Sequence, residues 1–430
     1  MEEHAPPFGC SVFRRQALIA RLRRVSASLL LFAASLVGPA VEVSWGQVPD
    51  LPTEHEGQIG PLFFNPGLVF SSGYDTNPWR ESGSEAVYDV VETYVTPQIA
   101  GWMTFGHLRI DLFGAVEVVK AGEGVASKNH QLGSNVLWDG PVLSPYLTFT
   151  SKHTNANPTG FEVGRKSMRN ENDAKAGVSV KMGSARAFGF VRQTKTDWDA
   201  DAIYQTSSLR EKLNRNEFGV GGGLEVMLTP LTGVRFFAEQ HTSDFIYAPI
   251  RNGTGARIGG SLSLTGPALI SGNVEAGLRE FRSASSDVSF RGLFANASLT
   301  RTFPTETTIG VRFERDLEFS YDATLAYFVG QSMVFTATQP LGESIATQFA
   351  IGRHTLTYDR ASPDTVPTNA VSEYALVLGR KVRKRTWVGA SVEWGQAEGN
   401  QPWKQRRITG FITFGSGPFQ RLDRPIPFTR

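Results

Sequence analysis

Charged residues alternate with apolar residues along several short stretches of this chain. In residues 108–118, the odd-numbered positions include Arg109, Asp111 and Glu117, whereas leucine, isoleucine and valine dominate the even-numbered positions. Guanidinium and carboxylate groups along one face can pair with each other or line a water-filled passage. The pattern returns along the chain and gives these candidate lining residues: Arg109, Asp111, Glu117, Glu225, Arg235, Glu239, Arg257, Glu275, Arg279, Arg312, Glu314 and Glu393.

Both signs of charge occur among these candidates, and two interpretations follow. The residues can pair across neighbouring strands and satisfy one another, or they can act on a passing solute as a weakly selective wall. Four phenylalanines are expected on the same face. They can stack on sugar rings or simply fill space: Phe113, Phe237, Phe281 and Phe294.

Catalysis is not expected. A hydrolase or transferase needs a nucleophile, a base and an orienting partner within reach of one another. The only suggestive arrangement places His153 beside Thr154 and His241 beside Thr242, and neither pair lies in a recognisable nucleophile motif. The sequence therefore favours a protein that is not an enzyme.

An Asp-x-Asp-x-Asp run at Asp197, Asp199 and Asp201 resembles the start of a calcium-binding loop. Such a loop also needs a turn glycine at the sixth position and an acidic residue at the twelfth. Both are missing, so we expect neither a metal ion nor any other cofactor.

The two-residue period predicts β-strands, and the turns between them are short and long in alternation. Nine longer polar connections interleaved with eight short turns predict about eighteen strands, an even number with short turns on one side. The fold predicted for residues 66–414 is therefore an all-β, transmembrane, antiparallel up-and-down β-barrel. The longer connections are predicted at residues 75–88, 120–129, 153–170, 195–214, 243–252, 282–287, 315–321, 358–369 and 396–404.

The N-terminal region predicts export from the cytoplasm. Five arginines between Arg14 and Arg24 precede an apolar run and then small residues, which is the layout of a cleavable secretory signal peptide over residues 1–47. Residues 48–65 are predicted as a short periplasmic lead-in and residues 415–430 as a periplasmic tail. The single cysteine, Cys10, lies in the leader, as suits a protein of an oxidising compartment.

Charge and hydropathy exclude other classes. The formal net charge of +2 is carried by the leader, so the mature chain is nearly neutral and gives no reason to expect nucleic-acid binding. After the leader, the sequence contains no apolar stretch of the length that a transmembrane helix needs.

Two segments resemble the β-barrel porin type 2 family. Residues 67–77 read Gly-Leu-Val-Phe-Ser-Ser-Gly-Tyr-Asp-Thr-Asn, and residues 94–97 read Tyr-Val-Thr-Pro. The resemblance spans essentially the whole mature chain. It implies an outer-membrane barrel, and several members are associated with exopolysaccharide production. One departure is that Phe414 is followed by a further tail, whereas such barrels usually end on an aromatic residue.

The resemblance implies an outer-membrane channel that works with a periplasmic export apparatus to export a glycan. The alternatives are a general diffusion porin for small hydrophilic solutes and a structural or adhesive barrel with a closed lumen. In each case the expected location is the bacterial outer membrane, and the expected partners include outer-membrane lipid and lipopolysaccharide.

Overall fold

A computed structural model of the 430-residue chain gives the fold. The predicted signal peptide, the first part of the lead-in and the tail after residue 415 lie outside the residues that the structure describes. The described residues are 57–77, 89–122, 125–156, 167–204, 207–265, 270–284, 289–321, 327–358, 368–399 and 402–415.

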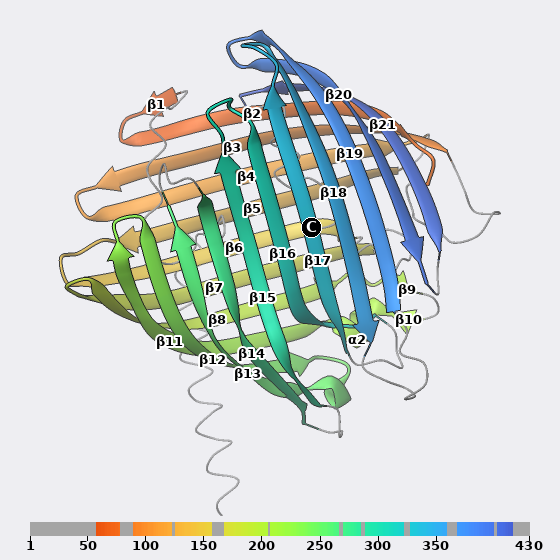
Figure 1. The fold of residues 1–430 in the computed structure, drawn as a ribbon. Coiled ribbons are helices and arrows are strands. Elements are labelled where there is room, and N and C mark those ends of the chain that lie inside the picture. Colours follow the sequence, from red (N-terminus) through yellow and green to blue (C-terminus); the bar gives the residue numbers. More distant parts are fainter. Residues whose placement is uncertain are drawn as a thin grey trace, which may run out of the picture.

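Eighteen antiparallel strands form a closed barrel (Figure 1), which confirms the predicted fold and strand number. Each strand pairs with its neighbours in sequence, and the barrel closes where β2 pairs with β21, from Leu68 opposite Phe414 to Asp75 opposite Arg407. The barrel strands are β2 (Leu62–Asp75), β3 (Val90–Phe105), β4 (Leu108–Ala121), β5 (Val125–Trp138), β6 (Leu143–Ala156), β7 (Ser167–Met182), β8 (Ala185–Trp198), β11 (Arg215–Thr229), β12 (Thr232–Phe245), β13 (Gly253–Leu264), β14 (Ser271–Ser283), β15 (Ser289–Thr302), β16 (Thr308–Phe319), β17 (Tyr327–Pro340), β18 (Ile345–Tyr358), β19 (Thr368–Arg383), β20 (Thr386–Glu398) and β21 (Trp403–Phe414).

Five short elements lie outside the eighteen barrel strands. At the N-terminal end, β1 pairs with the start of β2, so residues 57–65, which the sequence analysis places in the lead-in, already form strand structure. The connection between β8 and β11 contains a small hairpin and a single turn of helix. These elements are β1 (Gly57–Ile59), β9 (Ile203–Tyr204), β10 (Ser207–Ser208), the helix α2 (Leu209–Leu213) and the 3-10 helix η1 (Pro249–Arg251).

The outer face of the wall is apolar. Large side chains such as Leu293 (62%), Met333 (54%) and Leu278 (50%) are at least half exposed. The alternate residues on β14 and β15 are charged, small or buried aromatic residues. A water-soluble sheet would bury the apolar face, so this exposure means that the outer face contacts lipid.

Short turns join β3 to β4, β7 to β8 and β11 to β12, and longer connections alternate with them, as the sequence predicts. The long connection predicted over residues 120–129 is wrong, because β4 continues to Ala121 and β5 begins at Val125. The one predicted over residues 315–321 begins too early, since β16 continues to Phe319. In both places the ladder extends beyond the alternating apolar pattern, because backbone pairing does not require a lipid-facing side chain.

The wall is interrupted between β15 and β16. Their pairing stops at Ala295 opposite Arg315, although β15 begins earlier, at Ser289. Two side chains from the other strands take the place of the missing backbone partners. Arg315 Nε donates to the Leu293 carbonyl oxygen (3.3 Å), and the Tyr327 hydroxyl donates to the Ser289 carbonyl oxygen (2.8 Å).

Candidate functional site

The inner wall of the barrel carries the polar groups that a passing solute would meet. The structure places all twelve predicted lining residues on the strand faces opposite the exposed apolar ones, for example Arg109 and Glu117 against Val116 and Val118. These twelve residues lie in several separate groups along the inner wall. Arg109 Nε pairs with Asp111 (2.8 Å), and Glu117 accepts a hydrogen bond from Asn129 (2.9 Å).

A second group lies on β11–β14. Arg235 lies directly opposite Glu225 on one side, and Ser261, its neighbour on the other side, lies opposite Glu275. Glu239 lies opposite Arg257 in the same way. Arg279 on β14 lies directly opposite Arg257. The three remaining predicted residues also face inward: Arg312 and Glu314 on β16 and Glu393 on β20.

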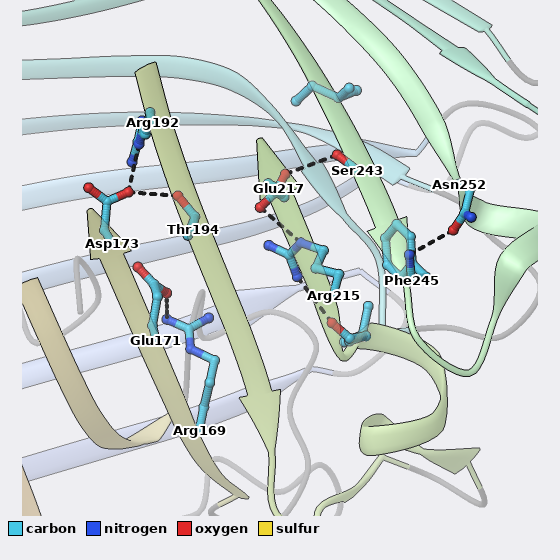
Figure 2. A network of polar contacts seen from close by, with 12 residues as sticks. Arg169, Glu171, Asp173, Arg192, Thr194, Arg215, Glu217, Ser243, Phe245 and Asn252 are labelled. Carbon is cyan, nitrogen blue, oxygen red and sulfur yellow. Dashed lines mark hydrogen bonds and ion pairs between the residues drawn. The ribbon is translucent and has the colours of Figure 1, made fainter. Parts of the chain in front are cut away.

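Ion pairs dominate the wall toward the long-loop end of β7–β12 (Figure 2). Asp173 binds Arg192 Nε and the Thr194 hydroxyl, both at 2.6 Å. Arg215 Nε and Ser243 Oγ hold opposite oxygens of Glu217 at 3.0 and 3.1 Å. Arg169, Glu171, Asp173, Lys175 and Arg192 of this group were not among the sequence candidates, because the alternation there has polar residues on both faces.

Several cations of the inner wall lie over aromatic rings, and three of them are particularly close. Lys175 Nζ is 4.0 Å from the centre of Phe190, and the Arg235 and Arg257 guanidinium carbons are 4.0 and 4.2 Å from Phe188 and Phe294. The predicted aromatic residue Phe294 is only 1% exposed, and Phe281 is 2% exposed. Their ring faces are covered by protein, which favours the space-filling interpretation over sugar stacking.

Inward-facing glycines make room for these rings. A Cβ atom on Gly223 would lie 1.9 Å from the Phe236 carbonyl oxygen and 2.8 Å from Cζ of Phe188. We expect Gly223→Ala to lower the free energy of unfolding by about 1–3 kcal/mol, the usual cost of overpacking. Urea unfolding of the refolded barrel measures this. Gly189→Ala is the control, because no atom lies within 3.9 Å of its Cβ position, and an equal loss in both variants would contradict the argument.

A hydrophobic cluster lies inside the barrel at its long-loop end, which we call the extracellular cluster. Helix α2 is capped by Ser208, whose hydroxyl accepts a hydrogen bond from the Glu211 amide (3.4 Å), and it buries Leu209 and Leu213. Tyr321, just after β16, packs against Trp198 and Tyr204 at ring-centre distances of 5.2 and 6.0 Å. The extracellular cluster consists of Trp198, Ala202, Tyr204, Leu209, Leu213, Phe245 and Tyr321.

The end of β16 contributes to this arrangement because it leans inward (Figure 1). Beyond the interruption in the wall, Leu317 packs with Phe281 and Tyr327, and Phe319 contacts Phe245 and Phe281 at ring-centre distances of 5.0 and 5.7 Å. Phe281 belongs to the inner face of β14, so the end of β16 at Leu317 and Phe319, its inward tip, lies inside the wall. The end of β16 and helix α2 therefore both occupy space inside the barrel at its long-loop end.

Charged groups fix this inward tip. Asp316 accepts from Arg279 Nη1 at 2.6 Å and from Arg257 Nη2 at 3.2 Å, and these three residues form the Asp316 cluster. Arg279 Nη1 also donates to the Leu317 carbonyl oxygen (3.1 Å), and Arg251 Nη1 donates to that of Ser320 (2.9 Å). One carboxylate thus serves two arginines that lie directly opposite each other on β13 and β14.

A further charged cluster lies across the strand pairing that closes the barrel. Arg407 on β21 lies 2.8 Å from Asp75 on β2 and 3.2 Å from Glu92 on β3, and its Nη1 lies 3.8 Å from Glu393 on β20. The Asp75 and Glu92 side chains are 1% and 2% exposed. These four residues form the Arg407 cluster. Of these four residues the sequence predicted only Glu393, and it placed Asp75 at the start of a long connection.

The candidate catalytic histidines lie apart. His153 is on the outer face, where its Nδ1 contacts Asn170 Oδ1 (2.6 Å) and its ring stacks on His130 at 5.2 Å. His241 is on the inner face, opposite Gly219 and Gly255. Asp197 pairs with Lys195 at 2.6 Å.

Two negative findings concern the described ranges only. Their His, Cys, Asp and Glu side chains form no group of three that could hold a metal ion. No helix in this part of the chain has the length and apolarity needed to cross a membrane.

Comparisons with known proteins give distant likenesses only. No protein-family model matches the chain, and no curated protein matches it. Among solved structures, OpdQ from Pseudomonas aeruginosa is similar at 9% identity and a TM-score of 0.43, covering 82% of this chain and 98% of that one. OccAB4 from Acinetobacter baumannii is similar at 8% identity and a TM-score of 0.43, covering 81% and 97%. A bacterial polysaccharide outer membrane secretin is similar at 9% identity and a TM-score of 0.33, covering 81% and 98%.

The fold itself gives the location. Only helices and closed barrels satisfy the whole backbone inside a bilayer, and closed antiparallel barrels with apolar outer faces belong to outer membranes. Membership of the β-barrel porin type 2 family stays a prediction from the resemblance. The protein is an eighteen-stranded β-barrel of the bacterial outer membrane.

Proposed function

We propose that this protein is a passive outer-membrane channel for small hydrophilic solutes. The observation that carries the proposal is a wall of paired positive and negative side chains facing inward in a barrel of eighteen strands. Barrels of that size enclose an aqueous passage. The proposal includes no catalytic step and no cofactor.

The arrangement of charge supports weak selectivity. Most inner-wall cations have a carboxylate partner within 3.2 Å, as in Arg109 with Asp111 and Arg192 with Asp173. Paired charges attract either sign of solute only weakly but keep the wall hydrated. The extracellular cluster and the inward tip of β16 favour a narrow passage and therefore small solutes.

Exopolysaccharide export is the second candidate, and it rests on the family resemblance. A periplasmic export apparatus would then deliver the glycan to the barrel. The hydrogen-bonding wall is compatible with a hydrated glycan, whereas the buried faces of Phe281 and Phe294 offer no platform for sugar rings.

Conductance of the refolded barrel in a planar bilayer tests the channel proposal. We expect stepwise currents in potassium chloride, and liposomes containing the barrel should admit monosaccharides faster than oligosaccharides of four or more units. A barrel that inserts and conducts no current would overturn the proposal and favour a structural or adhesive role.

A deletion strain separates the two candidates. We expect its secreted polysaccharide to be unchanged, with slower uptake of small solutes. Loss of secreted polysaccharide, restored by a plasmid-borne copy, would instead favour the export channel.

A further inference from the structure

Four arginines form a row on the outer surface of the barrel, near its extracellular end. They come from four of the five consecutive strands β14–β18, and we call them the outer arginine row. Glu280 on β14 lies directly opposite Arg291, and Gln331 on β17 lies directly opposite Arg315, so polar groups continue across the row. The outer arginine row consists of Arg282, Arg291, Arg315 and Arg353.

Apolar side chains lie directly below this row. Leu293 follows Arg291 on the outward face of β15, and Ile351 precedes Arg353 on that of β18. Met333, which lies opposite Arg353, is also exposed. Successive outward positions on a strand are about 6–7 Å apart, so the arginines lie one step beyond the lipid-facing belt.

The row is asymmetric between the two membrane faces. On the described parts of the same five strands, the outward positions near the periplasmic turns contain one arginine, Arg301, which lies over the Phe303 ring at 4.6 Å. The concentration of cations at the extracellular boundary therefore matches the outer leaflet, whose lipopolysaccharide carries several negative charges per molecule.

The row has more cations than acids. Glu280 forms an ion pair with Arg282 (2.5 Å). The Arg315 side chain donates hydrogen bonds to the Leu293 carbonyl oxygen and to Gln331 Oε1, both at 3.3 Å. Among the residues that the structure describes, no hydrogen bond or ion pair involves the side chains of Arg291 and Arg353, which are both exposed. Two guanidinium groups beside the lipid belt are thus available to an anion.

The interruption in the wall fixes the depth of the row. Backbone groups without partners are not tolerated in hydrocarbon, and the β15 edge loses its backbone partner above Ala295. Leu293 and Arg315, which meet at this edge, must therefore lie at the upper boundary of the hydrocarbon, at the level of the lipid head groups.

We propose that the outer arginine row binds the phosphate groups of lipopolysaccharide in the outer leaflet. Guanidinium groups bind phosphate oxygens in a bidentate geometry, and the apolar belt beneath the row contacts the acyl chains of the same molecule. Arg291 and Arg353 make the direct phosphate contacts, while Arg282 and Arg315 raise the local positive potential. The site is independent of the lumen and of the channel proposal.

Binding of purified lipopolysaccharide to the full-length mature barrel in detergent tests the proposal. We expect R291Q/R353Q to weaken binding about tenfold or more, since each surface cation contributes about 1 kcal/mol toward an anionic lipid. The matched control is R301Q/R380Q, which removes two exposed outward arginines at the periplasmic boundary and is expected to bind like the unchanged protein.

Dephosphorylated lipopolysaccharide and inorganic phosphate identify the contact. We expect the dephosphorylated lipid to bind the unchanged barrel as weakly as the intact lipid binds R291Q/R353Q, and inorganic phosphate at millimolar concentration not to compete. Equal binding of intact lipid by all variants, or equal binding of the two lipids, would overturn the proposal. Gel mobility before and after boiling verifies that each variant is folded.

Discussion

Replacing Arg407 by methionine is expected to destabilise the closed barrel by about 3–5 kcal/mol, the usual cost of removing one partner from a buried ion pair. Arg407 is the cation placed among Asp75, Glu92 and Glu393. Without it, the two almost fully buried carboxylates on β2 and β3 repel each other beside the β2–β21 pairing that closes the barrel. A lower urea midpoint, read from the loss of the unboiled gel form, measures the effect.

The neighbouring residue supplies the control. Arg406 is exposed on the outer face, so Arg406→Met removes the same charge from the same strand and should change stability by less than about 0.5 kcal/mol. Adding Asp75→Asn and Glu92→Gln to the methionine variant should restore part of the loss. A methionine variant as stable as the unchanged barrel would show that the Arg407 cluster does not hold the closure.

Replacing Asp316 by asparagine is expected to make the channel more selective for anions. The change removes the one carboxylate shared by Arg257 and Arg279. It leaves these like charges facing each other on adjacent strands and loosens the inward tip of β16. We expect the permeability ratio of chloride to potassium to rise about fivefold, since a unit charge at 4 Å contributes about 1 kcal/mol in water. Reversal potentials across a salt gradient measure it.

Asp201→Asn is the control for this change, because it removes the same charge from an exposed position in the β8–β11 connection. We expect the shift of its reversal potential to be about a tenth or less of the shift that the Asp316 variant shows. If both variants shift selectivity equally, the effect comes from the overall charge of the extracellular end and not from the Asp316 cluster.

The fold was largely predictable because a lipid-exposed strand must alternate. Each outward position has to be apolar and each inward position is free to be polar, so the face on which Arg109, Asp111 and Glu117 lie could be derived from residues 108–118 alone. Strand ends were less predictable. Beyond the lipid belt neither face has to meet hydrocarbon, so the alternation disappears while the backbone ladder continues, as at Ala121.

The arrangement of the candidate site could be predicted only in part. Pairs on adjacent strands, such as Glu225 with Arg235, follow from the register of a hairpin. The Asp316 cluster does not, because it joins β13 and β14 to the inward-leaning end of β16. The Arg407 cluster does not either, because it spans the pairing of the first barrel strand with the last, which is not a hairpin. The inward folding of α2 and of the β16 tip is also absent from the hydropathy pattern, since a short apolar segment has the same composition in an exposed loop and inside a barrel.

The Arg407 cluster also constrains the order of events during folding. Asp75 and Arg407 are 332 residues apart in sequence, and closing so long a loop has a large entropic cost before any contact forms. Hairpins between sequence neighbours form without that cost. The charges of β2 and β21 therefore stay hydrated until the two end strands meet, and their desolvation is the last event of barrel assembly.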